Sequence, residues 1–145
     1  MTSDRFALDY LRRARLRREA LDLLFRREGY ADVVRESQEV VELILKGPLR
    51  FIGIAPPKRH DVRLMVAQFV ERLPAAWAAA LEDLAGAATE LTHARAEAFY
   101  GDEDSLTPAS ELFDRDDATR ALMVVDRLLD LYGQLLDRPD PATDC

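Results

Sequence analysis

The residue best placed to do chemistry in this sequence is Arg95, in a stretch whose apolar residues recur every three or four positions. Continuing that apolar stripe by four residues from Leu91 reaches Arg95. An arginine on the inward edge of a helix needs a carboxylate partner or an anionic ligand. We therefore expect Arg95 either to pair with a carboxylate or to bind a phosphate, with Tyr100 at the end of the same stretch as a second ligand-binding candidate.

The two histidines offer little for catalysis. His60 follows a loop stiffened by two prolines and has no serine, cysteine or second histidine beside it. We expect His60 and its neighbour Asp61 to anchor that loop or to cap the following helix. His93 lies nearly opposite the apolar stripe, beside Glu90, and should be solvated. No zinc-ligand cluster, phosphate-binding glycine loop or nucleophile–base pair is present, so we predict no catalytic residue, no metal and no cofactor.

Arginine is concentrated near the start of the chain. Residues 1–27 hold eight arginines against four acidic residues, although the whole chain has a net charge of −7. Arg12, Arg13 and Arg17 are candidates for phosphate binding, because the guanidinium fork fits a phosphate. No aromatic residues are interleaved to stack on bases. A solvated helix face or a basic strip that meets an acidic partner explains the same residues.

Composition restricts the class of protein. A chain of 145 residues that is 48% hydrophobic suits one domain with its own core. No run approaches the roughly 18 apolar residues of a membrane span, and no apolar signal segment precedes the arginines. We therefore expect a cytoplasmic protein without a membrane partner. The sole cysteine, Cys145, excludes an internal disulfide and a cysteine-based metal site.

Five helical segments are predicted to position these residues. Each has apolar residues at helical spacing, and no segment alternates like a strand. The fold class expected is all-α, an antiparallel (up-and-down) bundle of four to five helices. We predict one domain over residues 1–138 and a disordered polar tail over residues 139–145. The helices are predicted at about 5–27, 30–51, a short stretch from 62, 75–100 and 114–136.

Prolines and capping residues suggest where these helices are interrupted. Pro48 should kink or break the second helix near residues 46–49. Asp114 should cap the last helix, with Asp117 three residues further on. The acidic segment 101–113 before it is predicted to be a loop long enough to be mobile.

A set of spaced residues in the first half of the chain has the pattern of a known family. A Gly-Tyr turn precedes a helix with an acid-Leu-x-Leu-Lys segment, and a Gly-Pro loop then ends in His-Asp. The residues are Gly29, Tyr30, Glu42, Leu43, Leu45, Lys46, Gly53, Pro56, Pro57, His60 and Asp61. In these residues the chain resembles the HEPN family of small prokaryotic helical domains. The resemblance implies a helical bundle, a homodimer, and a minimal nucleotidyltransferase encoded beside it as a partner.

The resemblance also implies a test for nuclease activity. Catalytic members of the family resemble each other in an arginine followed, after four to six residues, by a histidine near the end of the penultimate long helix. Two such motifs meet across a homodimer, where the arginine steadies the scissile phosphate and the histidine assists proton transfer. Arg95 matches the arginine, but the three histidine positions hold Tyr100, Gly101 and Asp102. The motif is therefore incomplete, since tyrosine, with a reference pKa of about 10, is a poor base near neutral pH.

Three functions remain open. The first is a dimeric, non-catalytic binding module that engages a nucleotide, RNA or a nucleotidyltransferase partner, as in a toxin–antitoxin pair. The second is a metal-independent ribonuclease with a diverged site around Arg95 and Tyr100. The third is a purely structural helical dimer. A homodimer is expected from the resemblance and from alanines outside the apolar stripe of the predicted fourth helix, Ala75, Ala76, Ala78 and Ala79.

Overall fold

The protein is a bundle of helices. The computed structural model describes residues 2–56, 58 and 62–137, and within these ranges it contains helices and no strand. The all-α bundle that the sequence predicts is confirmed. The division into a domain over residues 1–138 and a tail stays a prediction, and residues 139–145 lie outside the described ranges. The helices are α1 (Thr2–Arg26), α2 (Tyr30–Phe51), α3 (Arg63–Gln68), a 3₁₀ turn η1 (Val70–Arg72), α4 (Ala75–Asp83), α5 (Ala85–Tyr100), α6 (Ala109–Leu112) and α7 (Arg115–Leu136).

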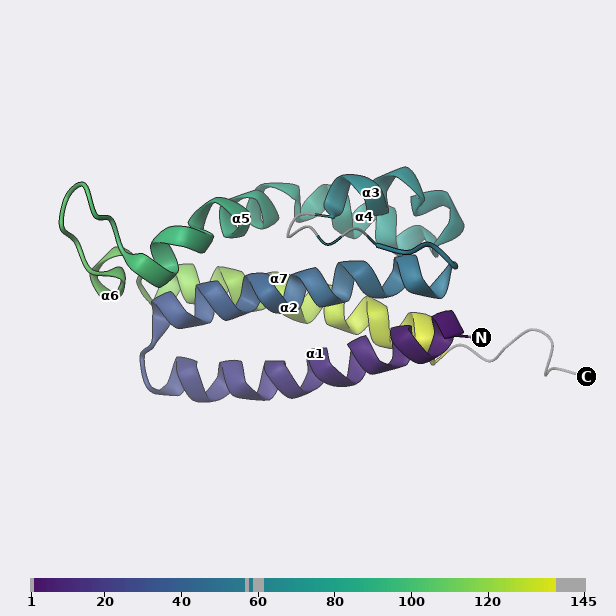
Figure 1. The fold of residues 1–145 in the computed structure, drawn as a ribbon, viewed down its shortest axis with the longest axis horizontal. Helices are drawn as coiled ribbons and strands as arrows, with labels where there is room; N and C mark the ends of the chain where they lie inside the picture. The colour runs from purple at the N-terminus through teal and green to yellow at the C-terminus, as the bar shows by residue number, and fades with distance from the viewer. Residues whose placement is uncertain (1, 57, 59–61, 138–145) are drawn as a thin grey trace, which may run out of the picture.

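Helix α2 is the centre of the bundle. It packs against α1, α5 and α7, while α1, among the described helices, contacts α2 and α7 (Figure 1). Its buried residues lie on more than one face of the helix, so α2 packs against several neighbouring helices at once. Fully burying one such side chain contributes about 1.5–3 kcal/mol. The fully buried residues of α2 include Val33, Val40, Ile44 and Leu49.

The sequence predicts a kink or a break near Pro48; the break is wrong, and the kink stays a prediction. Helix α2 runs without interruption from Tyr30 to Phe51, with Pro48 inside it and buried. Proline removes one backbone donor, but the carbonyl of Pro48 still accepts a hydrogen bond from the Ile52 N–H at 3.0 Å. The neighbours Gly47 and Leu49 are buried in the core. Tertiary packing therefore holds the helix together across the proline.

The single helix predicted over residues 75–100 is two helices, α4 and α5, separated by Leu84. Leu84 has φ −94° and ψ −1°, which lies outside regular helix geometry. The guanidinium of Arg63 and the hydroxyl of Thr89 both donate to the Ala85 carbonyl, at 3.0 and 2.8 Å. Gly86 is the second residue of α5, and glycine is a poor helix former. Apolar periodicity runs on through Leu84 and so could not reveal the interruption.

The third predicted helix is shorter than its apolar pattern suggested, because α3 ends at Gln68 and the 3₁₀ turn η1 follows. Val62 occupies the N-cap position of α3, and among the described residues no side-chain hydrogen bond caps the helix. The prediction that His60 or Asp61 caps this helix stays a prediction. Both residues lie outside the described ranges, so their role as loop anchors stays a prediction.

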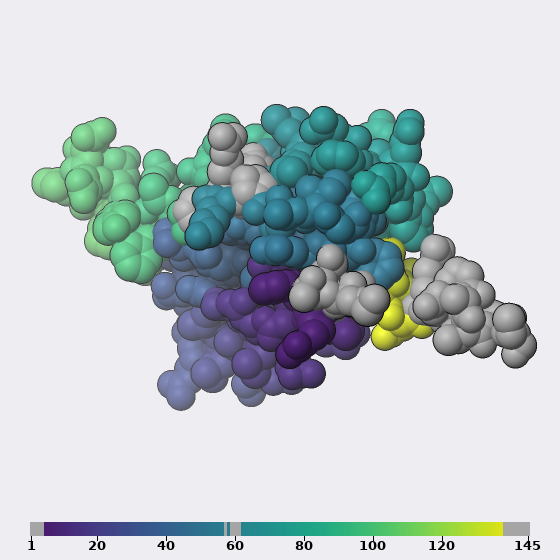
Figure 2. All heavy atoms as spheres, turned by 45° about the vertical axis from the view of Figure 1, so that its right-hand side comes forward, coloured from purple at the N-terminus to yellow at the C-terminus, as the bar shows by residue number. Residues whose placement is uncertain are grey.

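The acidic segment before α7 is more regular than the predicted loop. An antiparallel bridge joins Asp102 to Thr107, and the short helix α6 follows. Gly101 has φ 78°, and a Cβ atom there would lie 2.5 Å from the Thr107 carbonyl oxygen, so only glycine fits. This segment projects beyond the ends of the long helices, in green at the left of Figures 1 and 2.

The start of α7 follows the sequence-based prediction. The Asp114 side chain accepts a hydrogen bond from the Asp117 N–H at 2.9 Å. The Asp117 side chain accepts one from the Asp114 N–H, also at 2.9 Å. The two aspartates thus form a capping box, and the predicted cap is confirmed.

Candidate functional site

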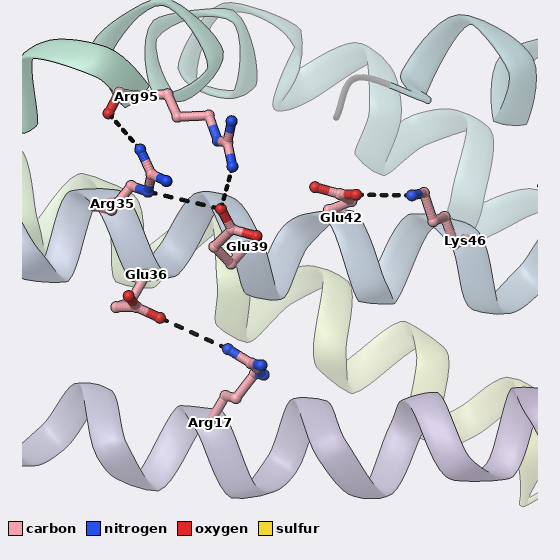
Figure 3. A network of polar contacts seen from close by, with 7 residues as sticks. All are labelled: Arg17, Arg35, Glu36, Glu39, Glu42, Lys46 and Arg95. Carbon is pink, nitrogen blue, oxygen red and sulfur yellow. Dashed lines mark hydrogen bonds and ion pairs between the residues drawn. The ribbon is translucent and has the colours of Figure 1, made fainter. Parts of the chain in front are cut away.

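Charged side chains line the face of α2 that looks toward α5. They recur at helical spacing, so they share one side of the helix. We call this group, together with one arginine of α5, the charged strip (Figure 3). On α2 the strip contains two ion pairs between residues four apart, Arg35 with Glu39 and Glu42 with Lys46. Its member from α5 is Arg95.

Arg95 is bound to a carboxylate, as its inward position suggested. The Nη2 atom of Arg95 lies 2.5 Å from Oε1 of Glu39, and the two side chains are 23% and 28% exposed. The Nε atom of Arg95 is buried and has no hydrogen-bond partner in the described part of the chain. The Arg95 guanidinium therefore lies at the contact between α2 and α5, where its Nη2 atom is paired with Glu39.

Arg35 is a second arginine that contacts Glu39, and it also contacts the backbone of Arg95. Its Nη1 atom donates to the backbone carbonyl of Arg95 at 3.1 Å, and its Nε atom lies 3.6 Å from the Glu39 carboxylate. The Arg35 guanidinium also stacks over the Phe99 ring at 5.0 Å. Glu39 thus lies between two arginines and balances part of their charge. A phosphate would compete with this carboxylate for the Nη2 atom of Arg95.

Tyr100 is not part of the charged strip. Its ring is 69% exposed and packs edge-on against Phe99, with ring centroids 4.7 Å apart. It lines an open hollow with no basic residue in the lining and four carboxylates, those of Glu97, Asp102, Glu103 and Asp104. The hydrogen bond from the Ser105 hydroxyl, with help from backbone N–H groups, lowers the pKa of Asp102 and keeps it ionised. Negative charge around Tyr100 opposes phosphate binding there.

The three arginines of α1 that the sequence singled out do not form one surface. Arg13 pairs with Asp9 on its own helix at 3.8 Å, and Arg17 reaches across to Glu36 of α2 at 3.7 Å (Figure 3). Arg12 has no ion-pair partner among the described residues. At about 100° per residue, Arg12 and Arg17 point some 140° apart around the helix.

A fourth arginine of α1, Arg18, links two helices, α1 and α7. It donates to Asp126 of α7 through Nε at 2.6 Å and Nη2 at 3.2 Å, and to Asp22 at 2.6 Å. The hydrogen bond to Asp126 is the main cause of the raised pKa of Arg18. Arg18 is therefore a structural residue.

Comparison with protein families identifies the chain. The family model of the HEPN domain matches residues 7–135, which extend from α1 into α7. The chain belongs to the HEPN family. Comparison with curated proteins and with solved structures gave no significant match.

In this HEPN domain the arginine of the nuclease motif is present, but its histidine is not. Arg95 lies in the second half of α5, and the positions where a histidine would follow hold Tyr100, Gly101 and Asp102. His93 lies on α5 itself and is exposed, two residues and about 200° around the helix from Arg95. The described part of α5 therefore places no imidazole beside the guanidinium.

Other kinds of site find little support in the HEPN bundle. The hollow lined by α2, α5, Phe113 and α7 has a volume of about 50 Å³. Pockets for nucleotide-sized ligands measure roughly 300–1,000 Å³, so this hollow is too small for one. Among the described residues, no group of three or more His, Cys, Asp or Glu side chains is arranged to hold a metal ion. None of the described helices combines the length and apolarity that crossing a bilayer requires.

Sequence reasoning found Arg95 but missed its partners. Arg35 and Glu39 were readable as a charged pair four residues apart on a helix that is otherwise largely buried. The apolar stripe of α2 predicts the helix, but it does not indicate which residues the charged positions between its members contact. A second helix had to be placed over α2 before Arg95 could be matched to Glu39.

Proposed function

We propose that this HEPN domain is a dimeric, non-catalytic binding module, and that its partner is a nucleotidyltransferase of the kind encoded beside such domains. The ion pair of Arg95 with Glu39 carries the proposal. In a nuclease the guanidinium must be free to meet a phosphate in the transition state. Here it is held by a carboxylate, and no histidine occupies the motif.

Charge favours a protein partner over RNA or a free nucleotide. The net charge is −7, and three of the four candidate arginines, Arg13, Arg17 and Arg95, pair with carboxylates. Binding to nucleic acid depends on cationic side chains that neutralise several phosphates together. An acidic HEPN domain next to a nucleotidyltransferase fits a two-protein system of the toxin–antitoxin type, acting in the cytoplasm.

The first experiment measures RNA cleavage by the purified protein. Labelled structured and single-stranded RNAs are incubated with the wild type and with Arg95→Ala, with and without chelator. We expect no cleavage above the buffer control. Saturable, chelator-resistant cleavage by the wild type that is lost in Arg95→Ala would overturn the proposal and establish a diverged ribonuclease.

The second experiment tests the partner. The protein is co-expressed with the nucleotidyltransferase encoded next to its gene, and complex formation is followed by size-exclusion chromatography with light scattering. A complex with defined stoichiometry is expected. Separate elution of the two proteins, together with no binding of RNA or nucleotide in titration, would leave the purely structural dimer.

A further inference from the structure

The end of α5 and the turn that follows it carry apolar side chains in solvent, where the chain projects beyond the long helices (Figures 1 and 2). Phe99 and Tyr100, the last two residues of α5, are 59% and 69% exposed. Their rings touch edge to face, so together they form one apolar patch. Leu106 in the turn is 86% exposed. We call residues 99–107 the acidic tip.

A hollow beside Tyr100 gives this patch an acidic border. The hollow is open to solvent and has a volume of about 330 Å³, which leaves room for a long side chain. Glu97, Glu103 and Asp104 line it, and none of them has an ion-pair partner among the described residues. Unpaired negative charge gathered in this way attracts a cation from another molecule.

The turn is held in one shape by its own hydrogen bonds. The backbone N–H groups of Asp102 and Thr107 each donate to the carbonyl of the other residue at 2.9 Å. The Asp102 carboxylate accepts hydrogen bonds from the N–H groups of Asp104 and Ser105 at 3.0 and 3.3 Å. Leu106 has φ 55°, a left-handed conformation that is strained for leucine, yet its side chain gains no burial in return. A strained residue that is held rigidly in solvent indicates a role in binding.

Aromatic rings of this chain already bind arginines. The Arg35 guanidinium lies 5.0 Å from the centroid of the Phe99 ring, and that of Arg115 lies 5.3 Å from the Phe25 ring. No cation of the described residues lies over the Tyr100 ring, although it is more exposed than that of Phe99. A cation over this ring would gain from the ring and from the carboxylates beside it.

We propose that the acidic tip is the surface on which a partner protein docks, and that the partner presents an arginine or lysine beside an apolar side chain. The cation enters the hollow and lies against Tyr100, while the apolar side chain packs on Phe99 and Leu106. Charge complementarity selects this occupant, because the carboxylates repel a nucleic acid and a bare cation would leave the apolar patch uncovered. This inference rests on the protein partner of the proposed function and assigns the surface that binds it.

The hollow lined by α2, α5, Phe113 and α7 is the rival docking surface. Its volume is about 50 Å³, so it admits less of a partner than the hollow beside Tyr100. Its charged residues have both signs, and Arg120 is already paired with Asp117. This rival hollow therefore selects neither a basic nor an acidic partner.

The first test titrates the isotope-labelled full chain with capped tripeptides and follows the amide signals by NMR. The peptide Leu-Arg-Leu should shift the signals of residues 96–107 saturably, and Leu-Glu-Leu should not. Gly-Arg-Gly should bind about fivefold more weakly, because it lacks the apolar side chains. Equal shifts by Leu-Glu-Leu, or shifts confined to other helices, would overturn the proposal. Spermidine that binds as tightly as Leu-Arg-Leu would also overturn it, in favour of a site for small polyamines.

The second test measures the affinity of the full chain for the nucleotidyltransferase encoded next to its gene, by calorimetry. Tyr100→Ala and Glu103→Lys should each weaken the complex by about tenfold or more. Met123→Ala and Glu71→Lys are the matched controls, because both residues are exposed outside the acidic tip. Both controls should bind like the wild type, with folding of all variants checked by circular dichroism. Wild-type affinity in Tyr100→Ala and Glu103→Lys would reject the acidic tip.

A third variant separates docking from stability. Asparagine tolerates the left-handed conformation better than leucine does, so Leu106→Asn should keep or raise the melting temperature. The same change removes an apolar contact and should weaken the complex severalfold. A turn that is only structural would keep the wild-type affinity in Leu106→Asn, and this result would overturn the role of Leu106 in docking.

These outcomes also separate this inference from the proposed function. A wild-type complex that is unaffected by Tyr100→Ala and Glu103→Lys keeps the partner and rejects the acidic tip as its surface. Binding of Leu-Arg-Leu at the tip without a complex keeps the surface and rejects the nucleotidyltransferase as the partner. The absence of both the peptide shifts and the complex rejects both.

Discussion

A Cβ atom placed on Gly47 would lie 2.1 Å from the hydroxyl oxygen of Tyr132. Because Gly47 has no side chain, α2 has a flat surface at this position, and the Tyr132 ring of α7 packs against it. The hydroxyl then donates to the backbone carbonyl of Ala7 in α1. One buried tyrosine thus joins the three long helices, and its removal from water raises its pKa.

We expect Gly47→Ala to destabilise the protein strongly, although alanine is the better helix former. The added methyl group must push the Tyr132 ring out of place, and overpacking of this kind costs about 1–3 kcal/mol. Gly86→Ala is the matched control, because Gly86 also lies inside a helix but a methyl group added there would have no atom within 4 Å. That change should stabilise the protein by up to about 1 kcal/mol.

Urea unfolding of both variants decides the point. Combining Gly47→Ala with Tyr132→Leu should cost less than the sum of the two single changes, because the clash is then absent. Equal effects of Gly47→Ala and Gly86→Ala would show that Tyr132 does not depend on the glycine.

Arg95→Ala should lower the stability by about 1–3 kcal/mol. The change leaves the partly buried Glu39 with only Arg35, whose Nε atom is 3.6 Å away. The loss should be smaller than for a fully buried pair because both side chains keep some contact with water. Arg127→Ala removes the exposed ion pair with Asp83 and should change the stability by less than about 1 kcal/mol.

Thermal unfolding of Arg95→Ala, Glu39→Ala and the double variant gives the coupling between the two residues. A value near zero would mean that Glu39 does not hold Arg95. An Arg95→Ala protein as stable as the wild type would point to a guanidinium kept for a ligand.

Any binding of polyanions should run through the arginines of α1 and fall steeply with salt. Replacing Arg12, Arg13 and Arg17 together by glutamate should abolish binding of heparin or RNA, since it reverses three charges on one helix. Arg12→Glu alone is the comparison, because Arg12 has no ion-pair partner among the described residues. Fluorescence anisotropy between 50 and 300 mM salt measures both. Unchanged binding by the triple variant would place the contact on another helix.

Acid should loosen the start of α7. The hydrogen bond from the Asp117 N–H is the main cause of the lowered pKa of Asp114. A carboxyl with a lowered pKa in the folded state stabilises the fold above its ordinary pKa of about 3.9, and this contribution is lost as the pH falls through the lower, folded-state pKa. Asp114→Ala should reduce the melting temperature at pH 7 and flatten its decline toward low pH.

Asp116→Ala is the control for this effect, since Asp116 lies in the first turn of α7 but outside the capping box. It should keep the pH dependence of the wild type. Identical acid profiles for the wild type and Asp114→Ala would assign the acid sensitivity to other carboxylates.

Features that depend on a single helix could be predicted from the sequence, whereas features that depend on contacts between helices could not. The cap at Asp114 and the ends of α2 are local properties and were predictable from spacing. The continuity of α2 through Pro48 depends on packing around Gly47 and Leu49, which belongs to the tertiary structure. The split at Leu84 involves Arg63 from another helix. Likewise Arg95 was visible from α5 alone, while Glu39 became its partner only when α5 was placed over α2.

The contacts that α7 makes with α1 also impose an order on folding. The hydrogen bond between Tyr132 and Ala7 spans 125 positions, and that between Arg18 and Asp126 spans 108. Such non-local contacts carry a large loop-closure entropy and form late. During synthesis the hairpin of α1 and α2 leaves the ribosome first, with the flat surface at Gly47 uncovered until α7 emerges. Apolar surface that is exposed in this way before folding is complete favours aggregation.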